Sequence, residues 1–316
     1  MKTFISYFKE YHASYYNAKL YLVFAGVISS LIFCNYYFEF ERGFIRQQSN
    51  PYMQILWFAI VNIVLYAFSI GLLKLFRKSK LVIRWDFVLY TFIGLVIISI
   101  DRSINVFSHE IKYYVHRHVY PAAFYMVANA SSLITMLIPL LIYKYTIDRQ
   151  QDFGLYGLRF KGVKFAMYKP LLLLIIPLVF FASFIPEFIQ YYPTYTKLYP
   201  ELAARYLHLP QWVIIGVYEI LYIGDFLFTE IAFRGLMVIG LIRFIGKDAI
   251  LPMVVVYVAL HFGKPIGETI SSAFGGYILG VLALYSKNIW GGVALHCGVA
   301  SCMEFFAWMQ LELMNA

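Results

Sequence analysis

Long uncharged apolar runs, separated by short basic segments, dominate the chain from about residue 20 onward. A run of about 20 apolar residues matches the hydrocarbon core of a bilayer, so each long run predicts a membrane-spanning helix. The predicted spans lie near residues 20–38, 52–73, 85–100, 119–143 and 170–189, and the last third adds apolar stretches at 211–223, 225–245, 249–262, 270–286 and 289–309. The pattern therefore predicts an all-α, polytopic transmembrane helix bundle of about eight or nine spans.

Two glycine features refine this prediction. The stretch 211–245 would measure roughly 52 Å as one helix, which exceeds a hydrocarbon core of about 30 Å. We therefore expect it to break near Gly224. In the stretch 270–286, Gly276 and Gly280 have the Gly-x-x-x-Gly spacing that lets two helices approach closely, and we expect it to serve packing inside the bundle.

Composition narrows the class of protein. Hydrophobic residues make up 61% of the chain and charged residues 14%, against about 45–50% and about 25% in soluble domains. A soluble enzyme, a disordered protein and a disulfide-stabilised secreted domain are therefore excluded. Cys34, Cys297 and Cys302 lie within apolar runs and are interpreted as core residues. The net charge of +9 does not predict a nucleic-acid partner, because the basic residues lie between the apolar runs.

The distribution of Lys and Arg predicts the orientation. With the N-terminus in the cytoplasm, more than twice as many basic residues fall on the cytoplasmic side as on the outer side, to which Arg42, Arg46 and Arg102 are assigned. We expect one membrane domain over residues 1–316. Within it, residues 1–200 hold spans without a functional motif, and the longest polar connection is 144–169.

Ionisable residues inside the predicted spans collect in the C-terminal third. A charge at the bilayer centre costs about 2.5–3.5 kcal/mol on insertion scales, so such a residue usually pairs, handles protons or ions, or performs chemistry. These residues are Glu219, Asp225, Glu230, Arg234, His261, His296 and Glu304. The asymmetry places any functional site in this third of the chain.

Three of these positions form candidate motifs. Glu230 and Arg234 are four residues apart, so they share a helix face as a buried salt bridge or as a carboxylate oriented by its arginine. His261 ends an apolar run and suits either a helix cap or a functional group. His296 lies mid-span among small residues, which leave space around it.

In this order the three motifs resemble the CPBP family, which comprises type II CAAX prenyl proteases, bacteriocin-processing enzymes and abortive-infection proteins. The family pattern is Glu-Glu-x-x-x-Arg, then Phe-x-x-x-His, then His-x-x-x-Asn. Here Glu230 and Arg234 match the first motif, His261 the second with Tyr257 in the Phe place, and His296 the third. The resemblance covers residues 211–305 and implies a multi-pass protein of the bacterial plasma (inner) membrane.

Two positions depart from the family pattern. Thr229 stands in the place of the first Glu, and Ala300 in the place of the Asn. In the family the first Glu and the motif-two His are thought to activate water, and the last His and Asn to stabilise the oxyanion. Asp225, one turn before Thr229, and Glu304, two turns after His296, are the candidate auxiliary groups, together with Thr229 and Tyr257 themselves.

The resemblance implies an intramembrane endopeptidase that hydrolyses a membrane-associated peptide or protein. Glu230 with His261 would activate water, Arg234 would orient Glu230, and His296 would polarise the scissile carbonyl. We expect either no cofactor or a divalent metal such as zinc, held by Glu230, His261 and His296. The expected partners are membrane lipid and the peptide substrate.

Two other functions remain open. Thr229 and Ala300 favour a catalytically impaired protein of the same fold that binds a partner as an immunity or scaffold protein. A transporter or proton pathway could instead use Asp225, Glu230, His261 and His296 as a relay.

Overall fold

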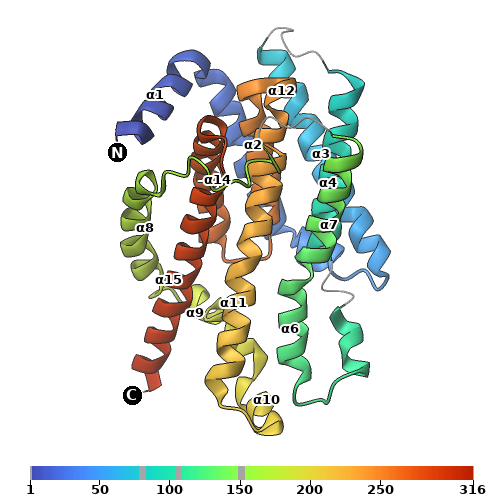
Figure 1. The fold of residues 1–316 in the computed structure, drawn as a ribbon, viewed down its shortest axis with the longest axis vertical. Helices are drawn as coiled ribbons and strands as arrows, with labels where there is room; N and C mark the ends of the chain where they lie inside the picture. Colours follow the sequence, from blue (N-terminus) through green and yellow to red (C-terminus); the bar gives the residue numbers. More distant parts are fainter. Residues whose placement is uncertain (1, 78–82, 104–107, 149–153, 316) are drawn as a thin grey trace.

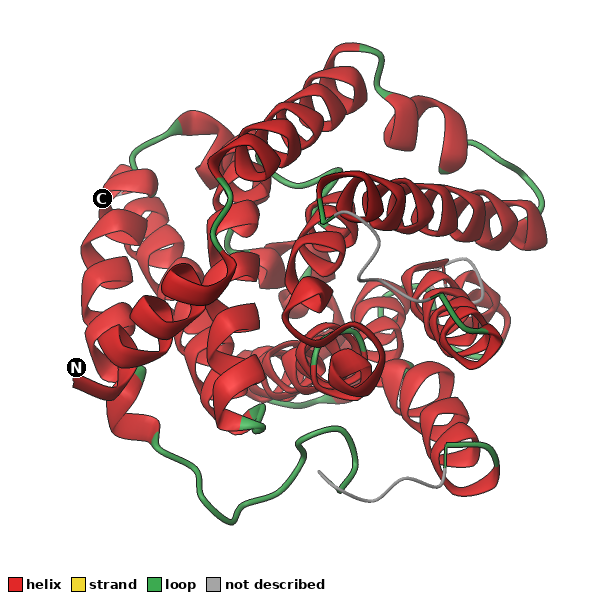
Figure 2. Ribbon diagram, turned by 90° about the horizontal axis from the view of Figure 1, so that it is seen from above, coloured by secondary structure: helices red, strands yellow, loops and turns green. Residues whose placement is uncertain are grey.

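The computed structural model describes the chain except residues 1, 78–82, 104–107, 149–153 and 316. Within that part of the chain the secondary structure is helical and contains no strand. The all-α helix bundle is therefore confirmed (Figures 1 and 2). Part of the predicted polar connection 144–169 lies outside the described residues.

The N-terminal half contributes two capped spans and several shorter helices. Asn17 and Asn50 cap α2 and α3 by accepting hydrogen bonds from Leu20 N and Tyr52 N, and Pro51 begins α3. The helices are α1 (Lys2–Tyr15), α2 (Ala18–Tyr37), α3 (Pro51–Phe76), α4 (Trp85–Ser103), α6 (Tyr120–Ala130) and α7 (Ile138–Thr146); a π-helical turn, η1 (Phe40–Ile45), follows α2.

The C-terminal half contains the helices that carry the predicted motifs. They are α8 (Lys169–Ala182), α9 (Pro186–Tyr191), α10 (Pro200–Leu207), α11 (Gln211–Glu230), α12 (Ile242–Ile245), α13 (Ile250–Leu260), α14 (Ile266–Ser286) and α15 (Trp290–Asn315). A π-helix, η6 (Ile231–Leu236), follows α11 directly. In Figure 1, α11 and α15 run along the long axis of the molecule, with α6 beside α11 and α8 beside α15.

Fewer helices than predicted meet the requirements for crossing a membrane. Among the described residues, five do so by length and apolar composition: Ala18–Tyr37, Pro51–Phe76, Tyr120–Thr146, Ile266–Ser286 and Trp290–Met314. The pair Lys169–Ala182 and Pro186–Leu207, bent by 94°, would make a sixth. The predicted count of eight or nine spans is therefore not confirmed.

Two sequence predictions in the last third are wrong. The helix does not break near Gly224, because α11 continues through it to Glu230, and a single helical glycine costs only about 1 kcal/mol. The stretch 249–262 does not form a full span, because α13 has 11 residues, about 16 Å at 1.5 Å per residue. Apolar runs of this length usually form buried core helices.

The central element of the bundle is α13. Every residue from Ile250 to Ala259 is buried, and α13 packs against α2, α3 and α14. A Cβ at Gly276 would lie 2.9 Å from the Tyr257 ring, and one at Gly280 would lie 2.9 Å from Met253. The Gly-x-x-x-Gly pair therefore brings α14 close to α13, as the spacing predicts.

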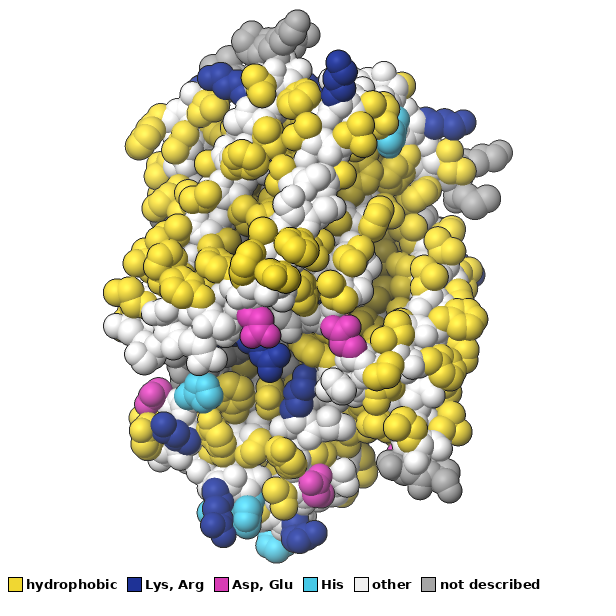
Figure 3. Space-filling model, turned by 180° about the vertical axis from the view of Figure 1, so that it is seen from behind, with side chains coloured by type: hydrophobic (Ala, Val, Ile, Leu, Met, Phe, Trp, Pro, Cys, Tyr) yellow, Lys and Arg dark blue, Asp and Glu magenta, His cyan; other side chains and the backbone are white. Residues whose placement is uncertain are grey.

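The surface agrees with a membrane setting. Seen from behind, hydrophobic side chains cover the middle and upper part of the molecule, and charged side chains gather toward its lower part and at its upper edge (Figure 3). Large exposed hydrophobic residues include Leu22, Leu75, Ile220 and Phe274. An apolar surface of this extent indicates contact with lipid.

Two neighbouring glycines of α14 provide a test of the close packing. Gly276→Ala should destabilise the protein by about 1–3 kcal/mol, because the added methyl overpacks the Tyr257 ring. A methyl group added at Gly275 would meet no atom within 4 Å, so Gly275→Ala should be neutral or slightly stabilising. Thermal unfolding in detergent micelles compares the two variants, and equal midpoints would contradict the packing described.

Candidate active site

The site is built around a carboxylate at the point where α11 changes from α-helix to π-helix. Glu230 is the last residue of α11, and η6 follows with a hydrogen bond from Met237 N to Ala232 O. In this turn Arg234 Nη1 lies 3.1 Å from Glu230 Oε1, and the two side chains are 1% and 0% exposed. The predicted i, i+4 pair is therefore present as a buried ion pair, and π-helical turns are common at functional sites.

The second component comes from α15. Gly292 lies against the Glu230 carboxylate, since a Cβ at this position would collide with Oε2. One turn later, His296 Nδ1 lies 2.8 Å from Glu230 Oε1, and the His296 ring stacks on Phe226 of α11 at 5.0 Å. The glycine thus brings α15 close enough for the imidazole to contact the carboxylate.

The third component is Tyr257 of α13. Its hydroxyl lies 2.9 Å from His296 Nε2, and its ring packs between Gly276 and the Arg234 guanidinium, whose Cζ is 4.2 Å from the ring centroid. An ionised carboxylate only accepts hydrogen bonds, so we assign the proton of His296 to Nδ1 and let Nε2 accept from the phenol. The result is a continuous chain of carboxylate, imidazole and phenol.

His261 reaches this chain through Tyr257. Its Nδ1 is 2.9 Å from the Tyr257 carbonyl oxygen, and the two rings are 4.6 Å apart. No hydrogen bond joins His261 to Glu230, although both are among the described residues. The histidines are the more accessible members of the cluster: His261 is 9% exposed and the His296 side chain 17%.

The two positions that depart from the family pattern add no ionisable group here. Thr229 is half-buried beside Glu230, and Ala300 is a buried methyl group one turn after His296 on α15. The carboxylate of the cluster is therefore supplied by Glu230.

Two predicted auxiliary residues lie elsewhere. Asp225 lies beside Asp101 and Ser132, and Asp101 accepts a hydrogen bond from Thr135.

Glu304 accepts hydrogen bonds from the backbone and hydroxyl of Thr194, at 2.7–3.0 Å, about 12 Å along α15 from His296. The structure therefore does not bring Asp225 or Glu304 to Glu230.

The metal alternative finds no support in the arrangement of donors. Among the described residues no three His, Cys, Asp or Glu side chains lie close enough to hold a metal ion. Glu230 Oε1 faces His296 Nδ1, and His261 Nδ1 faces a backbone carbonyl. The described geometry therefore does not gather Glu230, His261 and His296 around one position, and a divalent metal held by these residues stays a prediction.

Sequence reasoning missed a second buried ion pair near His261. Glu41 and Arg102, 2.9 Å apart, come from η1 and α4 and contact the turn that carries His261. The charge pattern along the chain instead predicts Arg102 among the outer loop charges. Its position directly after an apolar run was the only signal, and that position does not reveal a contact 158 residues away.

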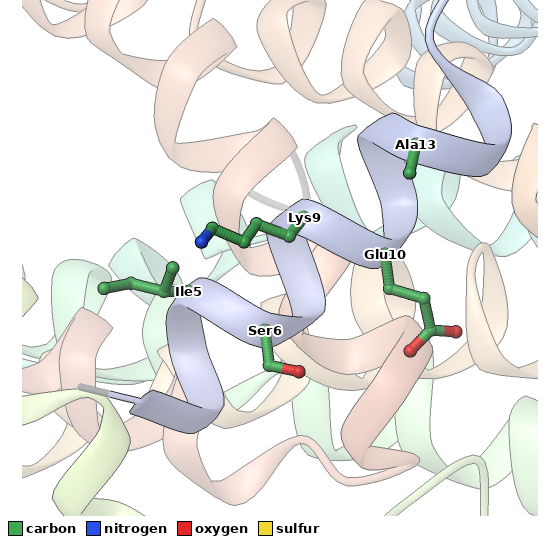
Figure 4. Close-up of a pocket in the computed structure, with 5 residues that line it drawn as sticks. All are labelled: Ile5, Ser6, Lys9, Glu10 and Ala13. Carbon is green, nitrogen blue, oxygen red and sulfur yellow. The ribbon is translucent and has the colours of Figure 1, made fainter.

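A surface concavity of about 660 Å³ lies apart from these residues, along α1. It is lined by Ile5, Ser6, Lys9, Glu10 and Ala13, whose side chains project from successive turns of the helix (Figure 4). It is an open surface depression, and none of its lining residues belongs to the Glu230 cluster.

Comparison with known proteins gives one family match. Residues 209–302 match the family model of Type II CAAX prenyl endopeptidase Rce1-like proteins. The resemblance to this family is therefore confirmed over α11 to the middle of α15, close to the predicted range 211–305. Neither the curated proteins nor the solved structures gave a match. The apolar helices together with this protease family indicate a multi-pass membrane protein.

The buried ion pair makes a clear prediction about stability. Arg234→Met should destabilise the protein by about 3–5 kcal/mol, because it leaves the buried Glu230 carboxylate without its cation. Adding Glu230→Gln removes that charge too, so the double variant should recover part of the loss. Thermal unfolding in micelles tests this, and a double variant less stable than Arg234→Met would contradict it.

Proposed function

From the match of residues 209–302 to type II CAAX prenyl endopeptidases, we propose that this protein is an intramembrane endopeptidase that hydrolyses a peptide bond of a membrane-associated peptide or protein. The observation that carries the proposal is the hydrogen-bonded chain from Glu230 through His296 to Tyr257. An imidazole acts as a general base when a buried carboxylate bonds to its Nδ1–H and a hydroxyl group lies at its Nε2.

In the proposed mechanism His296 activates water. Glu230 holds Nδ1–H, so Nε2 can take a proton from water directly or through the Tyr257 hydroxyl, and the carboxylate stabilises the resulting imidazolium. Apart from the 3.1 Å ion-pair contact between Arg234 Nη1 and Glu230 Oε1, Glu230 Oε2 and the three Arg234 nitrogens have no hydrogen-bond partner among the described residues. Buried polar atoms of this kind commonly bind water, which supports a hydrated site.

The two histidines exchange the roles expected from the family pattern. Because Glu230 bonds to His296, we assign water activation to this pair. His261, whose ring lies 4.6 Å from the Tyr257 ring, is then the group that polarises the scissile carbonyl. Arg234 balances and orients the carboxylate.

The family match and the apolar surface support the substrate class and the location that we propose. A CAAX-type peptide, presented from the lipid, is the first substrate to test, with membrane lipid as the surrounding partner. We propose that the N-terminus lies in the cytoplasm, which the excess of Lys and Arg on that side supports, and that the membrane is the plasma membrane, which the family resemblance supports.

Peptide cleavage in detergent micelles, followed by mass spectrometry, tests the proposal. Glu230→Gln and His296→Ala should each lower kcat/KM by about 10²–10⁴-fold, because each removes a member of the general base. Tyr257→Phe should lower kcat, whereas Tyr218→Phe should not. Tyr218 is the matched control because its hydroxyl is also buried and hydrogen-bonded, but to Thr194 and not to His296. Full activity in Glu230→Gln would disprove the mechanism.

A catalytically impaired binding protein is the second candidate, favoured by Thr229 and Ala300. Under this alternative the wild-type protein cleaves none of the peptides, and Thr229→Glu/Ala300→Asn gains activity. Under the endopeptidase proposal the wild-type protein is active, and Thr229→Ala leaves its rate unchanged because Thr229 adds no ionisable group to the cluster. The same cleavage assay distinguishes the two.

A further inference from the structure

The turn that carries His261 joins the end of α13 to the start of α14. It begins after Leu260 and reverses at Gly263, which has φ +82°, a conformation that favours glycine. The last carbonyls of a helix lack partners within the helix and need donors from elsewhere. The donors to this turn therefore determine where its backbone, and with it His261, is held.

Arg102 of α4 supplies donors on both sides of His261. Its Nη1 donates to Leu260 O, and its Nη2 donates to Phe262 O at 3.0 Å. The same Nη2 lies 2.9 Å from Glu41 Oε1, which also accepts from Arg46 Nε at 2.9 Å. Glu41 is 2% exposed, so the guanidinium is held by a buried carboxylate that is itself fixed.

The carbonyls of the rest of the turn are also held by neighbouring side chains. Thr269 Oγ1 donates to His261 O at 2.7 Å. Tyr36 of α2 donates to Lys264 O at 2.5 Å and lies 2.6 Å from the Thr269 hydroxyl. Apart from Thr269, the side chains that hold this turn come from α2, η1 and α4, outside the segment matched by the family model.

We propose that Arg102, fixed by Glu41, is the positioning residue that sets the place of His261 in the active site. The inference rests on the proposed function, because it matters to catalysis only if His261 acts on the substrate. A planar guanidinium can bind two carbonyls and a carboxylate in one fixed geometry, whereas an ammonium group on a flexible stem cannot. The N-terminal half thus takes part in the site through the backbone of the His261 turn.

The chain offers a matched control at the other end of α13. Arg77 Nε lies 3.3 Å from Asp248 Oδ1, and its Nη2 donates to Tyr15 O at 2.7 Å. Asp248 lies just before the first residue of α13, whereas Leu260, whose carbonyl binds Arg102, is its last residue. Arg77 is therefore also an arginine of the N-terminal half that contacts a carboxylate and a carbonyl, but it does not contact the His261 turn.

The kinetic test is a double-mutant cycle. Arg102→Lys keeps a cation beside Glu41 and should lower kcat with little change in KM. Arg102→Met should lower kcat by about 10²-fold, the cost of a displacement of roughly 1 Å at a reacting group. In a His261→Ala background neither substitution should lower kcat further, and Arg77→Lys should leave kcat unchanged in both backgrounds. An equal loss in the His261→Ala background, or the same loss from Arg77→Lys, overturns the proposal.

A labelling experiment decides the inference without relying on activity. Diethyl pyrocarbonate modifies accessible imidazoles, and exposed His109 serves as the internal standard. Arg102→Lys should raise the labelling rate of His261 severalfold over that in the wild-type protein and in Arg77→Lys; equal rates overturn the proposal. If the wild-type protein cleaves no peptide, the proposed function fails, while the labelling result still stands for or against Arg102.

Discussion

The Glu230 carboxylate determines much of the architecture around it, because a charge with no exposed surface must be compensated where it lies. The effective cost of burying an ion is several kcal/mol, and it is offset only by close, well-directed partners. Here those partners are Arg234 one turn along the chain and His296 on α15. Arg234 lies on the π-helical turn after α11, and the contact with His296 requires a glycine at position 292, where any side chain would occupy the space of the carboxylate.

The sequence was informative wherever a local pattern was sufficient. The apolar runs predicted the five long apolar helices, and the i, i+4 spacing predicted the Glu230–Arg234 pair. Local patterns failed where length or partners decide the outcome. α13 has a continuous apolar sequence but too few residues to cross a bilayer, and Gly224 lies within a helix that tolerates it. That Glu230 would bond to His296 depends on how α15 packs against α11, which no spacing along the chain reveals.

The sequence divides the chain into a third that carries the motifs and a remainder without a recognisable motif, but the fold brings residues from both parts to the site. The backbone on either side of His261 is held by Arg102, which Glu41 fixes, and by Tyr36. Arg102 and Tyr36 bind backbone carbonyls that are at least 158 residues away from them in the sequence. Contacts over such separations leave no periodic signal in a single sequence. A charged residue at the end of an apolar run can equally be a loop residue or the partner of a distant helix end.

The space around the Tyr257 ring bears on how a protein with this fold could diversify. The ring lies between Gly276 and the Arg234 guanidinium, and a phenylalanine would fill the same space and keep both contacts. Tyrosine and phenylalanine codons differ by one nucleotide. A single nucleotide change could therefore add or remove a hydroxyl beside His296 without disturbing the fold, so the hydrogen-bonded chain can change at this position while the helix packing around it stays the same.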